Sequence, residues 1–254
     1  MSVFITLATI VLIYSVVWFL LSIYLKRNDI ADIAWGLGFV IIAWSSFFLS
    51  EFATMKLITN CLITFWGLRL SFHIYKRAKN KPEDFRYLKW RNEWKHFYIR
   101  SYLQVFLLQG IFMYIIALSI IFINIGDSKE LNWIVIIGFM VWLLGFLFEV
   151  IADRQLSKFK KLSTNKNKVI QTGLWKYSRH PNYFGEVVLW WGIFIISCSI
   201  ENWFYTIVSP LLITYLILFL SGIPMLEEKY KHNTDFQLYK KRASIFIPIP
   251  PKKI

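Results

Sequence analysis

The sequence predicts an all-α integral membrane protein with seven transmembrane helices, and its composition leads to this class. Hydrophobic residues make up 57% of the 254 residues and charged residues 17%, against about 45–50% and about 25% in soluble domains. Aromatic residues reach 19%, and Trp and Tyr are enriched at membrane interfaces. Soluble, disordered and fibrous classes are therefore excluded.

Apolar runs along the chain are long enough to cross a bilayer, which takes about 20 residues per helix. We expect seven spans, at about 2–25, 33–50, 57–75, 101–123, 132–152, 183–200 and 203–223. The run at 33–50 is the shortest, and its failure to span would reverse every later orientation. No basic stretch precedes the first run, so we expect it to remain in the mature protein as a span.

The distribution of basic residues predicts the orientation. The chain has 29 Lys and Arg against 15 Asp and Glu, a net charge of +14. In a membrane protein such an excess belongs to cytosolic loops, so a nucleic-acid partner is not expected. Under strict alternation, 26 basic residues fall on one side and two, Lys56 and Lys129, on the other. We therefore expect the N-terminus outside and the C-terminus in the cytosol.

The loops predict a single domain over residues 1–254. The three large cytosolic segments, at about 76–100, 153–182 and 224–254, are each shorter than the roughly 50 residues of an independent domain. No Rossmann, P-loop or nucleophile-elbow motif occurs. The two cysteines show no metal-binding spacing, so no metal is expected. Any cofactor must be held by helix ends and short loops.

Ionisable residues within the spans are costly and indicate function. They lie at one predicted depth, near the cytosolic ends of their spans: Asp32, Arg69, His73, Glu149, Asp153 and Glu186. Residues four apart share a helix face, so we expect these groups around a polar cavity open to the cytosol. The alternative is an ion-pair network that only locks helices, for example Arg69 with Glu149. Such a network does not explain the shared depth of the whole set.

Two polar segments indicate a phosphate-bearing ligand. Residues 83–87 combine acids with Arg86 and Tyr87, and phosphate binding uses guanidinium donors and rings that stack. A solvated positive-inside surface is the alternative reading, and it suits the nearby lysines better. In the segment 178–186, Pro181 suits the first turn of a helix. The amides and side chains before it can meet an anion, and Asn182 can bind an amide or a ribose.

The segment Arg179-His180-Pro181-Asn182-Tyr183-Phe184-Gly185-Glu186 resembles the motif of a bacterial membrane reductase-like family. That family is related to the steroid 5-alpha-reductases and the sterol C14/C7 reductases. Segments 29–36, 83–87, 149–153 and 246–248 resemble it in the same order and spacing. The resemblance implies a seven-helix reductase using NADPH, in a bacterial inner membrane or the endoplasmic reticulum. An apolar enone would enter from the lipid bilayer.

The resemblance also implies roles for single residues. Asn182 and Glu186 resemble the contacts to the nicotinamide amide and ribose. Asp153 and Glu149 resemble the polar pair at the adenosine or ribose end, although relatives often carry Asn in place of Glu149. The full set of implied cofactor contacts is Arg86, Tyr87, Glu149, Asp153, Arg179, His180, Asn182, Tyr183, Glu186 and Tyr230.

The catalytic end departs from the steroid reductases, in which a Glu on the second span and a Tyr on the third polarise the substrate carbonyl. Here the second span offers Asp32, and the third carries Trp66 in place of a phenol. We expect Asp32 and Arg69 to be catalytic and Trp35 and Trp66 to contact substrate. Hydride would pass from nicotinamide to the β-carbon of a conjugated C=C. Neutral Asp32, with a raised pKa, would stabilise the enolate.

Two other functions remain open at this point. Arg-His-Pro-x-Tyr followed by Gly also occurs in isoprenylcysteine and phospholipid methyltransferases, whose S-adenosylmethionine carries no phosphate. The basic loops favour NADPH over that cofactor. A sterol- or lipid-binding scaffold without activity would have no need of the costly buried acids. Sterols, fatty enones, prenyl chains and quinones all remain as substrates, and no oligomeric state is predicted.

Overall fold

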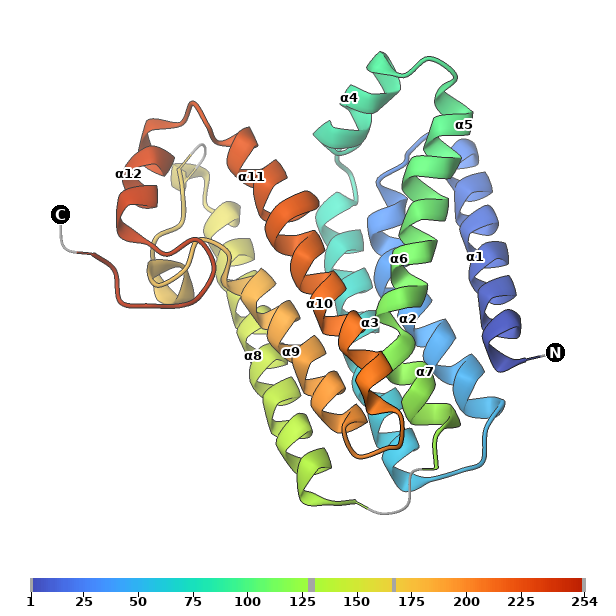
Figure 1. Cartoon of the computed structure of the whole chain (residues 1–254). Helices are drawn as coiled ribbons and strands as arrows, with labels where there is room; N and C mark the ends of the chain where they lie inside the picture. Colours follow the sequence, from blue (N-terminus) through green and yellow to red (C-terminus); the bar gives the residue numbers. More distant parts are fainter. Residues whose placement is uncertain (1, 128–130, 166–167, 253–254) are drawn as a thin grey trace. The chain divides into compact units, whose positions relative to one another are not determined.

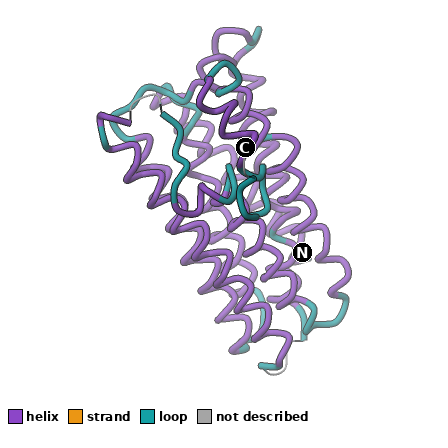
Figure 2. Tube along the Cα trace, turned by 90° about the vertical axis from the view of Figure 1, so that its left-hand side faces the viewer, coloured by secondary structure: helices purple, strands orange, loops and turns teal. Residues whose placement is uncertain are grey.

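A computed structural model describes residues 2–127, 131–165 and 168–252 (Figure 1). Within these residues the chain is helical with connecting loops, and no strand forms (Figure 2). One isolated bridge joins Ser178 to Ser244. The chain divides into two compact units, Met1–Leu131 with Ser199–Ser209, and Asn132–Cys198 with Pro210–Ile254. The all-α class predicted from the sequence is confirmed.

The first unit contains three long helices, followed by a short helix and a segmented helix. The long helices are α1 (Val3–Leu25), α2 (Ile30–Phe48) and α3 (Thr54–Ala78). The short helix is α4 (Phe85–Glu93). The segmented helix consists of α5 (Phe97–Ser101), a π-helical stretch (Tyr102–Leu107), α6 (Leu108–Ile116) and α7 (Leu118–Ile125). A 3-10 segment, Trp203–Ile207, completes the unit.

Helices α2 and α3 pack backbone against backbone near the start of α2. A Cβ atom on Gly67 would lie 2.5 Å from the carbonyl oxygen of Gly36, so only glycine allows this approach. Small residues at helix crossings permit such packing in membranes. The Ser71 hydroxyl also donates to the carbonyl of Ile33 at 2.7 Å. These contacts fix the first turn of α2, which carries Asp32.

The second unit is built on two long helices and a segmented C-terminal part. The long helices are α8 (Trp133–Lys161) and α9 (Pro181–Ser197). The C-terminal part comprises α10 (Val208–Tyr215), a π-helical stretch (Leu216–Leu220), α11 (Ile223–Lys229) and α12 (Thr234–Arg242). Pro181 occupies the first turn of α9, as the sequence predicts.

Glycines also allow α8 and α9 to approach closely. Gly138 and Gly145 lie seven residues apart on α8, and Gly185 and Gly192 lie seven apart on α9. A Cβ atom on Gly185 would lie 2.5 Å from the backbone nitrogen of Glu149. This contact brings the polar end of α8 against the first turns of α9.

Within the residues that the structure describes, six helical stretches are long and apolar enough to cross a membrane. They are Val3–Leu25, Ile30–Phe48, Thr54–Ala78, Phe97–Ile116, Trp133–Lys161 and Trp203–Lys229, and they correspond to six of the seven predicted spans. The seventh predicted span, 183–200, falls on α9, which has 17 residues and is shorter than all six. Exposed apolar side chains such as Val17 and Leu20 on α1 suit a lipid-facing surface. The chain is therefore a multi-pass integral membrane protein.

Candidate functional site

The first unit brings two predicted site residues, Arg86 and Tyr87, to a third, Asp32. Asp32 lies in the first turn of α2, and both oxygens of its carboxylate accept hydrogen bonds. The Arg86 guanidinium donates to Oδ2 at 2.6 Å, and the Tyr87 hydroxyl donates to Oδ1 at 2.6 Å. Arg86 and Tyr87 begin α4, where the Asp84 side chain caps the helix by accepting from the Arg86 amide at 3.1 Å. The cap therefore presents both donors to Asp32.

Burial and charge set the protonation of the two donors. Burial works to lower the pKa of Arg86, but Asp32 and the other acids around it raise that pKa above its ordinary value. Burial and the negative charge of Asp32 hold the pKa of the Tyr87 phenol well above its usual range. Burial also works to raise the pKa of Asp84, yet its hydrogen bonds to Arg86 and the positive charge of Arg86 bring it below the ordinary value. Asp32 therefore meets a permanent cation and a neutral phenol.

The Tyr87 ring is fixed by apolar packing. Its edge meets the ring of Trp90 at 5.3 Å, and it belongs to a buried cluster with Ile30, Val105 and Phe106. On the third span, Trp66 stands where the resemblance implies a phenol. The structure supplies a phenol from α4 instead, because the chain folds back after α3. No spacing in the sequence connects Asp32 with Tyr87.

The other predicted residues of the first unit lie on α2 and α3. Trp35 and Trp66 both contact Phe39, with ring centroids at 5.1 and 5.5 Å, so the three rings form an aromatic row. Trp66 is fully buried and Trp35 is half-buried. Arg69 is half-buried on α3, three residues beyond Trp66. Its catalytic role and the substrate contacts of the two Trp residues stay predictions.

The second unit gathers the predicted cofactor residues of α8 and α9. Asp153, which is buried, accepts from the Asn182 amide at 3.2 Å. Glu149 and Glu186 are buried one turn away from this pair on their own helices. The close contact at Gly185 explains the arrangement, because it places the backbone of α9 directly against Glu149. Carboxylates and an amide are thus concentrated at the beginning of α9.

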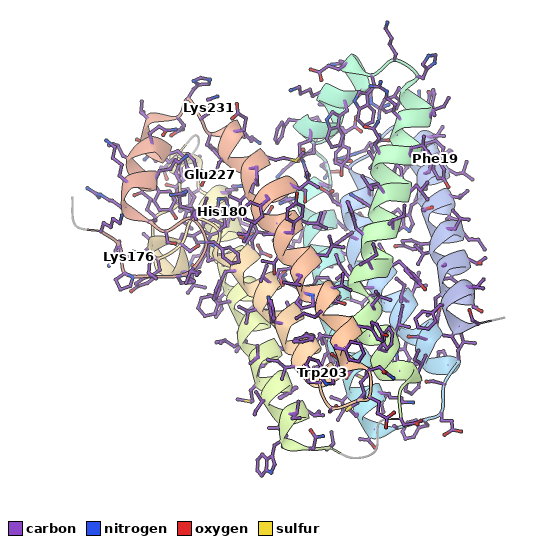
Figure 3. The ribbon with its side chains drawn as sticks, in the orientation of Figure 1. Phe19, Lys176, His180, Trp203, Glu227 and Lys231 are labelled. Carbon is purple, nitrogen blue, oxygen red and sulfur yellow. The ribbon has the colours of Figure 1, made fainter. Side chains whose placement is uncertain are left out.

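Glu227 on α11 is the centre of a second cluster in this unit. The Arg179 guanidinium donates to Glu227 Oε1 at 2.7 Å (from Nη2) and 2.8 Å (from Nε), and Lys240 Nζ lies 2.9 Å from Oε2. His180 Nε2 lies 3.5 Å from Oε1, and Figure 3 shows the two side chains close together. Burial lowers the pKa of His180 despite the opposing effect of Glu227. The Tyr183 ring stacks on the imidazole, with centroids at 5.8 Å.

The C-terminal segment holds the turn that precedes α9. The Arg179 amide donates to the Ser244 carbonyl at 2.8 Å, and the Ser178 hydroxyl donates to the Phe246 carbonyl at 2.7 Å. The Tyr239 hydroxyl donates to the Ser178 carbonyl at 3.0 Å. Tyr230, a predicted cofactor contact, packs on Phe236 in the same segment at 5.4 Å. The motif around Arg179 is therefore positioned by the tail.

Three residues of these clusters are absent from the sequence prediction. They are Glu227, Lys240 and Tyr239, and all belong to the C-terminal helices. Glu227 adjoins Glu228 in a charged stretch that reads as an exposed helix surface. The sequence carries no signal that assigns it to Arg179, which is 48 residues away.

The sequence is similar to those of a known family and of several curated proteins. Residues 18–243 match the family described as "Protein of unknown function (DUF1295)". The chain belongs to the DUF1295 family. It is 32% identical over 111 residues to 3-oxo-5-alpha-steroid 4-dehydrogenase 1 of Bos taurus, covering 44% of this chain and 40% of that protein. It is 30% identical over 73 residues to steroid 5-alpha-reductase DET2 of Arabidopsis thaliana, covering 29% and 28%.

The similarity to individual relatives covers only part of the chain. An uncharacterized protein of Schizosaccharomyces pombe is 25% identical over 178 residues, covering 58% of this chain and 51% of that protein. No solved structure matches this DUF1295 protein. The chain aligns with less than half the length of the steroid reductases named above. The predicted relation to the steroid 5-alpha-reductases is confirmed.

Proposed function

We propose that this protein is an NADPH-dependent membrane reductase that acts on the conjugated C=C of an apolar, steroid- or lipid-like enone. The observation that carries the proposal is the 2.6 Å hydrogen bond between Tyr87 and Asp32 at the start of an apolar helix. A carboxyl and a phenol placed together can hold a carbonyl oxygen and stabilise the enolate that forms there. The relatives named as steroid reductases support the same chemistry.

The residues of the first unit would act on the carbonyl end of the substrate. Reduction adds a hydride to the β-carbon and a proton to the α-carbon; NADPH, when bound, would supply the hydride and solvent water the proton. With substrate bound, neutral Asp32 and Tyr87 would each donate an O–H to the carbonyl oxygen in place of their mutual hydrogen bond, and Arg86 would keep Asp32 oriented through its 2.6 Å contact with Oδ2. Arg69 would assist at the same end. Trp35 and Trp66 would contact the apolar body of the substrate.

The residues of the second unit fit the polar parts of NADPH. Asn182 combines an amide donor and acceptor next to the buried Asp153, which suits a carboxamide and ribose hydroxyls. Glu149 and Glu186 add buried acceptors. Basic and aromatic groups suit the phosphates and rings of the cofactor. The residues proposed for that part are Arg179, His180, Tyr183 and Tyr230. Arg86 and Tyr87, which the resemblance also implies as cofactor contacts, lie at Asp32 and would act on the carbonyl end instead.

We further propose that α9 is the seventh span and that both units belong to one reductase domain. The family match supports the single domain because it runs from residue 18 to residue 243, through both units. The basic residues support an N-terminus outside and a C-terminus in the cytosol. A bacterial inner membrane and the endoplasmic reticulum both suit this topology.

Ligand binding and turnover by the detergent-purified chain test the proposal. Calorimetry would compare NADPH, NADH and S-adenosylmethionine, and turnover would be followed by the near-ultraviolet absorbance of reduced nicotinamide. We expect NADPH to bind and to be oxidised only when a conjugated ketosteroid is added, with the saturated ketone found by mass spectrometry. Binding of S-adenosylmethionine alone would overturn the proposal and favour a methyltransferase.

A further inference from the structure

Two short connections in the first unit exchange hydrogen bonds reciprocally. Residues 26–29 join α1 to α2, and residues 79–84 join α3 to α4. Asp29 of the first connection accepts the Asp84 amide of the second at 3.0 Å. Glu83 of the second accepts the Asn28 amide of the first at 2.5 Å. Each connection thus provides a carboxylate that binds the backbone of the other.

An arginine supports the carboxylate of the first connection. The guanidinium of Arg27 holds Asp29 through two hydrogen bonds, Nε to Oδ1 at 2.9 Å and Nη2 to Oδ2 at 2.7 Å. Its Nη1 crosses to the other connection and donates to the Lys81 carbonyl at 2.9 Å. The hydrogen bond with Asp29 raises the pKa of Arg27 above its ordinary value. A planar guanidinium is suited to such two-point binding.

The second connection repeats the arrangement in the opposite direction. Arg91 of α4 holds Glu83 through two hydrogen bonds, from Nε to Oε2 and from Nη2 to Oε1, both at 3.0 Å. Its Nη2 also reaches the Lys26 carbonyl of the first connection at 3.3 Å. We call the two arginine–carboxylate pairs, Arg27–Asp29 and Arg91–Glu83, the connection clamp.

The carboxylates of the clamp are well shielded from solvent. The side chains of Asp29 and Glu83 are 7% and 6% exposed. Burial of a carboxylate is costly unless it is paired and hydrogen-bonded. Each of these two has a guanidinium and a backbone amide, so removing its charge would leave the partner arginine and amide poorly satisfied.

We propose that Asp29 and Glu83 are positioning residues that set the distance between Asp32 and Tyr87. Asp32 lies three residues after Asp29 at the start of α2, and Tyr87 lies three residues after Asp84 at the start of α4. The clamp therefore fixes the backbone next to both ends of the Asp32–Tyr87 hydrogen bond. This role rests on the proposed reductase function, and Asp29 and Glu83 act only through the pair they position.

Catalysis depends on the clamp because reacting groups tolerate little displacement from their positions. A shift of about 1 Å in a positioned group can cost about a hundredfold in rate. Loosening either connection would move Asp32 relative to Tyr87 without removing either side chain. The clamp would then affect turnover and its pH dependence while leaving NADPH binding nearly unchanged.

Charge-neutral variants of equal shape test this role. Asp29→Asn and Glu83→Gln each keep one carbonyl oxygen and lose the charge. Arg27→Lys is a milder change, because it keeps the positive charge but loses the bidentate hydrogen bonding to Asp29. Glu93→Gln is the matched control, because Glu93 lies at the far end of α4, outside the clamp, and is an exposed acid in a loose pair with Lys89 at 3.9 Å. Amide hydrogen exchange of residues 26–32 and 79–88, NADPH affinity, and kcat and KM across pH would be measured for each.

We expect faster amide exchange in both segments and a fall in kcat of about tenfold to a hundredfold for Asp29→Asn and Glu83→Gln. The pH profile of kcat should shift, and the Kd for NADPH should stay within about twofold of the wild type. Arg27→Lys should give an intermediate loss. Glu93→Gln should match the wild type in every measurement.

The outcomes separate the clamp from the proposed function. Unchanged exchange in the variants overturns the clamp, and this readout needs no reductase activity. Faster exchange with wild-type kcat and pH profile overturns the positioning role and leaves a purely structural clamp. A wild-type protein without reductase activity overturns the proposed function and the positioning role with it, and exchange alone then decides whether the clamp exists.

Discussion

Asp32 in the first unit and Glu227 in the second are both carboxylates at the centre of a polar cluster, but their surroundings differ in net charge. Around Asp32 and the connection clamp, three arginines face four carboxylates, and a phenol completes the group. Around Glu227, two cations, Arg179 and Lys240, and the imidazole of His180 face one carboxylate. The first cluster has an acidic surplus and the second a basic one.

This difference suggests a division of labour. A basic surplus attracts phosphate, whereas an acidic surplus repels it. We therefore expect the phosphates of NADPH to depend on the second cluster, and carbonyl and proton chemistry to depend on the first. Substitutions that change one cluster at a time test the division directly.

The largest effect is expected for Asp32→Asn. The variant keeps the shape of the side chain but replaces one of its two acceptor oxygens with an amide NH2 group. That group cannot accept the hydrogen bond from Arg86 or Tyr87. Turnover should fall about a hundredfold to a thousandfold, the usual effect of losing a group that stabilises an oxyanion. Calorimetry should give wild-type affinity for NADPH.

The control for this experiment is Asp235→Asn, which removes an exposed acid from the first turn of α12 in the second unit. It should leave turnover unchanged. Wild-type turnover by Asp32→Asn with intact NADPH binding would remove Asp32 from the catalytic set.

Tyr87→Phe should produce the next largest effect. The ring and its packing on Trp90 remain, and only the hydroxyl that donates to Asp32 is lost. Groups that transfer a proton or polarise the substrate accelerate a reaction about a hundredfold or more. The kcat should therefore fall by about that factor, with little change in the Kd for NADPH. A loss of NADPH affinity instead of kcat would place Tyr87 at the cofactor. Tyr98→Phe, at an exposed tyrosine, is the control.

The sequence predicts those features that depend on local patterns. Apolar runs predict seven spans, and six of them coincide with described helices that are long and apolar enough to cross a membrane. Pro181 predicts the start of α9. The resemblance around residues 179–186 predicts the steroid reductase relation. The sequence also singles out Asp32, Asn182 and Asp153, because polar groups near the end of an apolar span are costly and indicate a functional site.

Contacts between segments far apart in the chain could not be predicted from the sequence. Tyr87 meets Asp32 across 55 residues, and Arg179 meets Glu227 across 48. Each pairing depends on how the chain turns between helices, which no spacing encodes. The glycines of α8 and α9 are different, because their seven-residue spacing is visible in the sequence and marks close helix packing.

A smaller effect is expected for Lys240→Gln, which reduces the basic surplus around Glu227. The Lys240 side chain is 39% exposed, so its contribution is screened by water and amounts to about 1 kcal/mol or roughly fivefold in Kd. NADPH affinity should fall more than NADH affinity, because NADPH carries the extra phosphate. Lys241→Gln, at the exposed neighbouring residue, is the control. Equal losses for both nucleotides would contradict a role for Lys240 at the extra phosphate that distinguishes NADPH from NADH.

The smallest effect concerns pH and the stability of the first cluster. The hydrogen bonds and charge of Arg86 outweigh burial and hold the pKa of Asp84 below its ordinary value of 3.8. A carboxyl with a depressed pKa stabilises the folded state above its ordinary pKa, and this contribution is lost as the pH falls through the folded value. Because Asp84 is 30% exposed, the contribution is less than about 1 kcal/mol. Thermal unfolding in detergent should therefore show a slightly steeper loss of stability below pH 4 for the wild type than for Asp84→Asn. Parallel curves for the two proteins would mean that the Asp84–Arg86 pair contributes nothing, and that the capped start of α4 depends on the connection clamp alone.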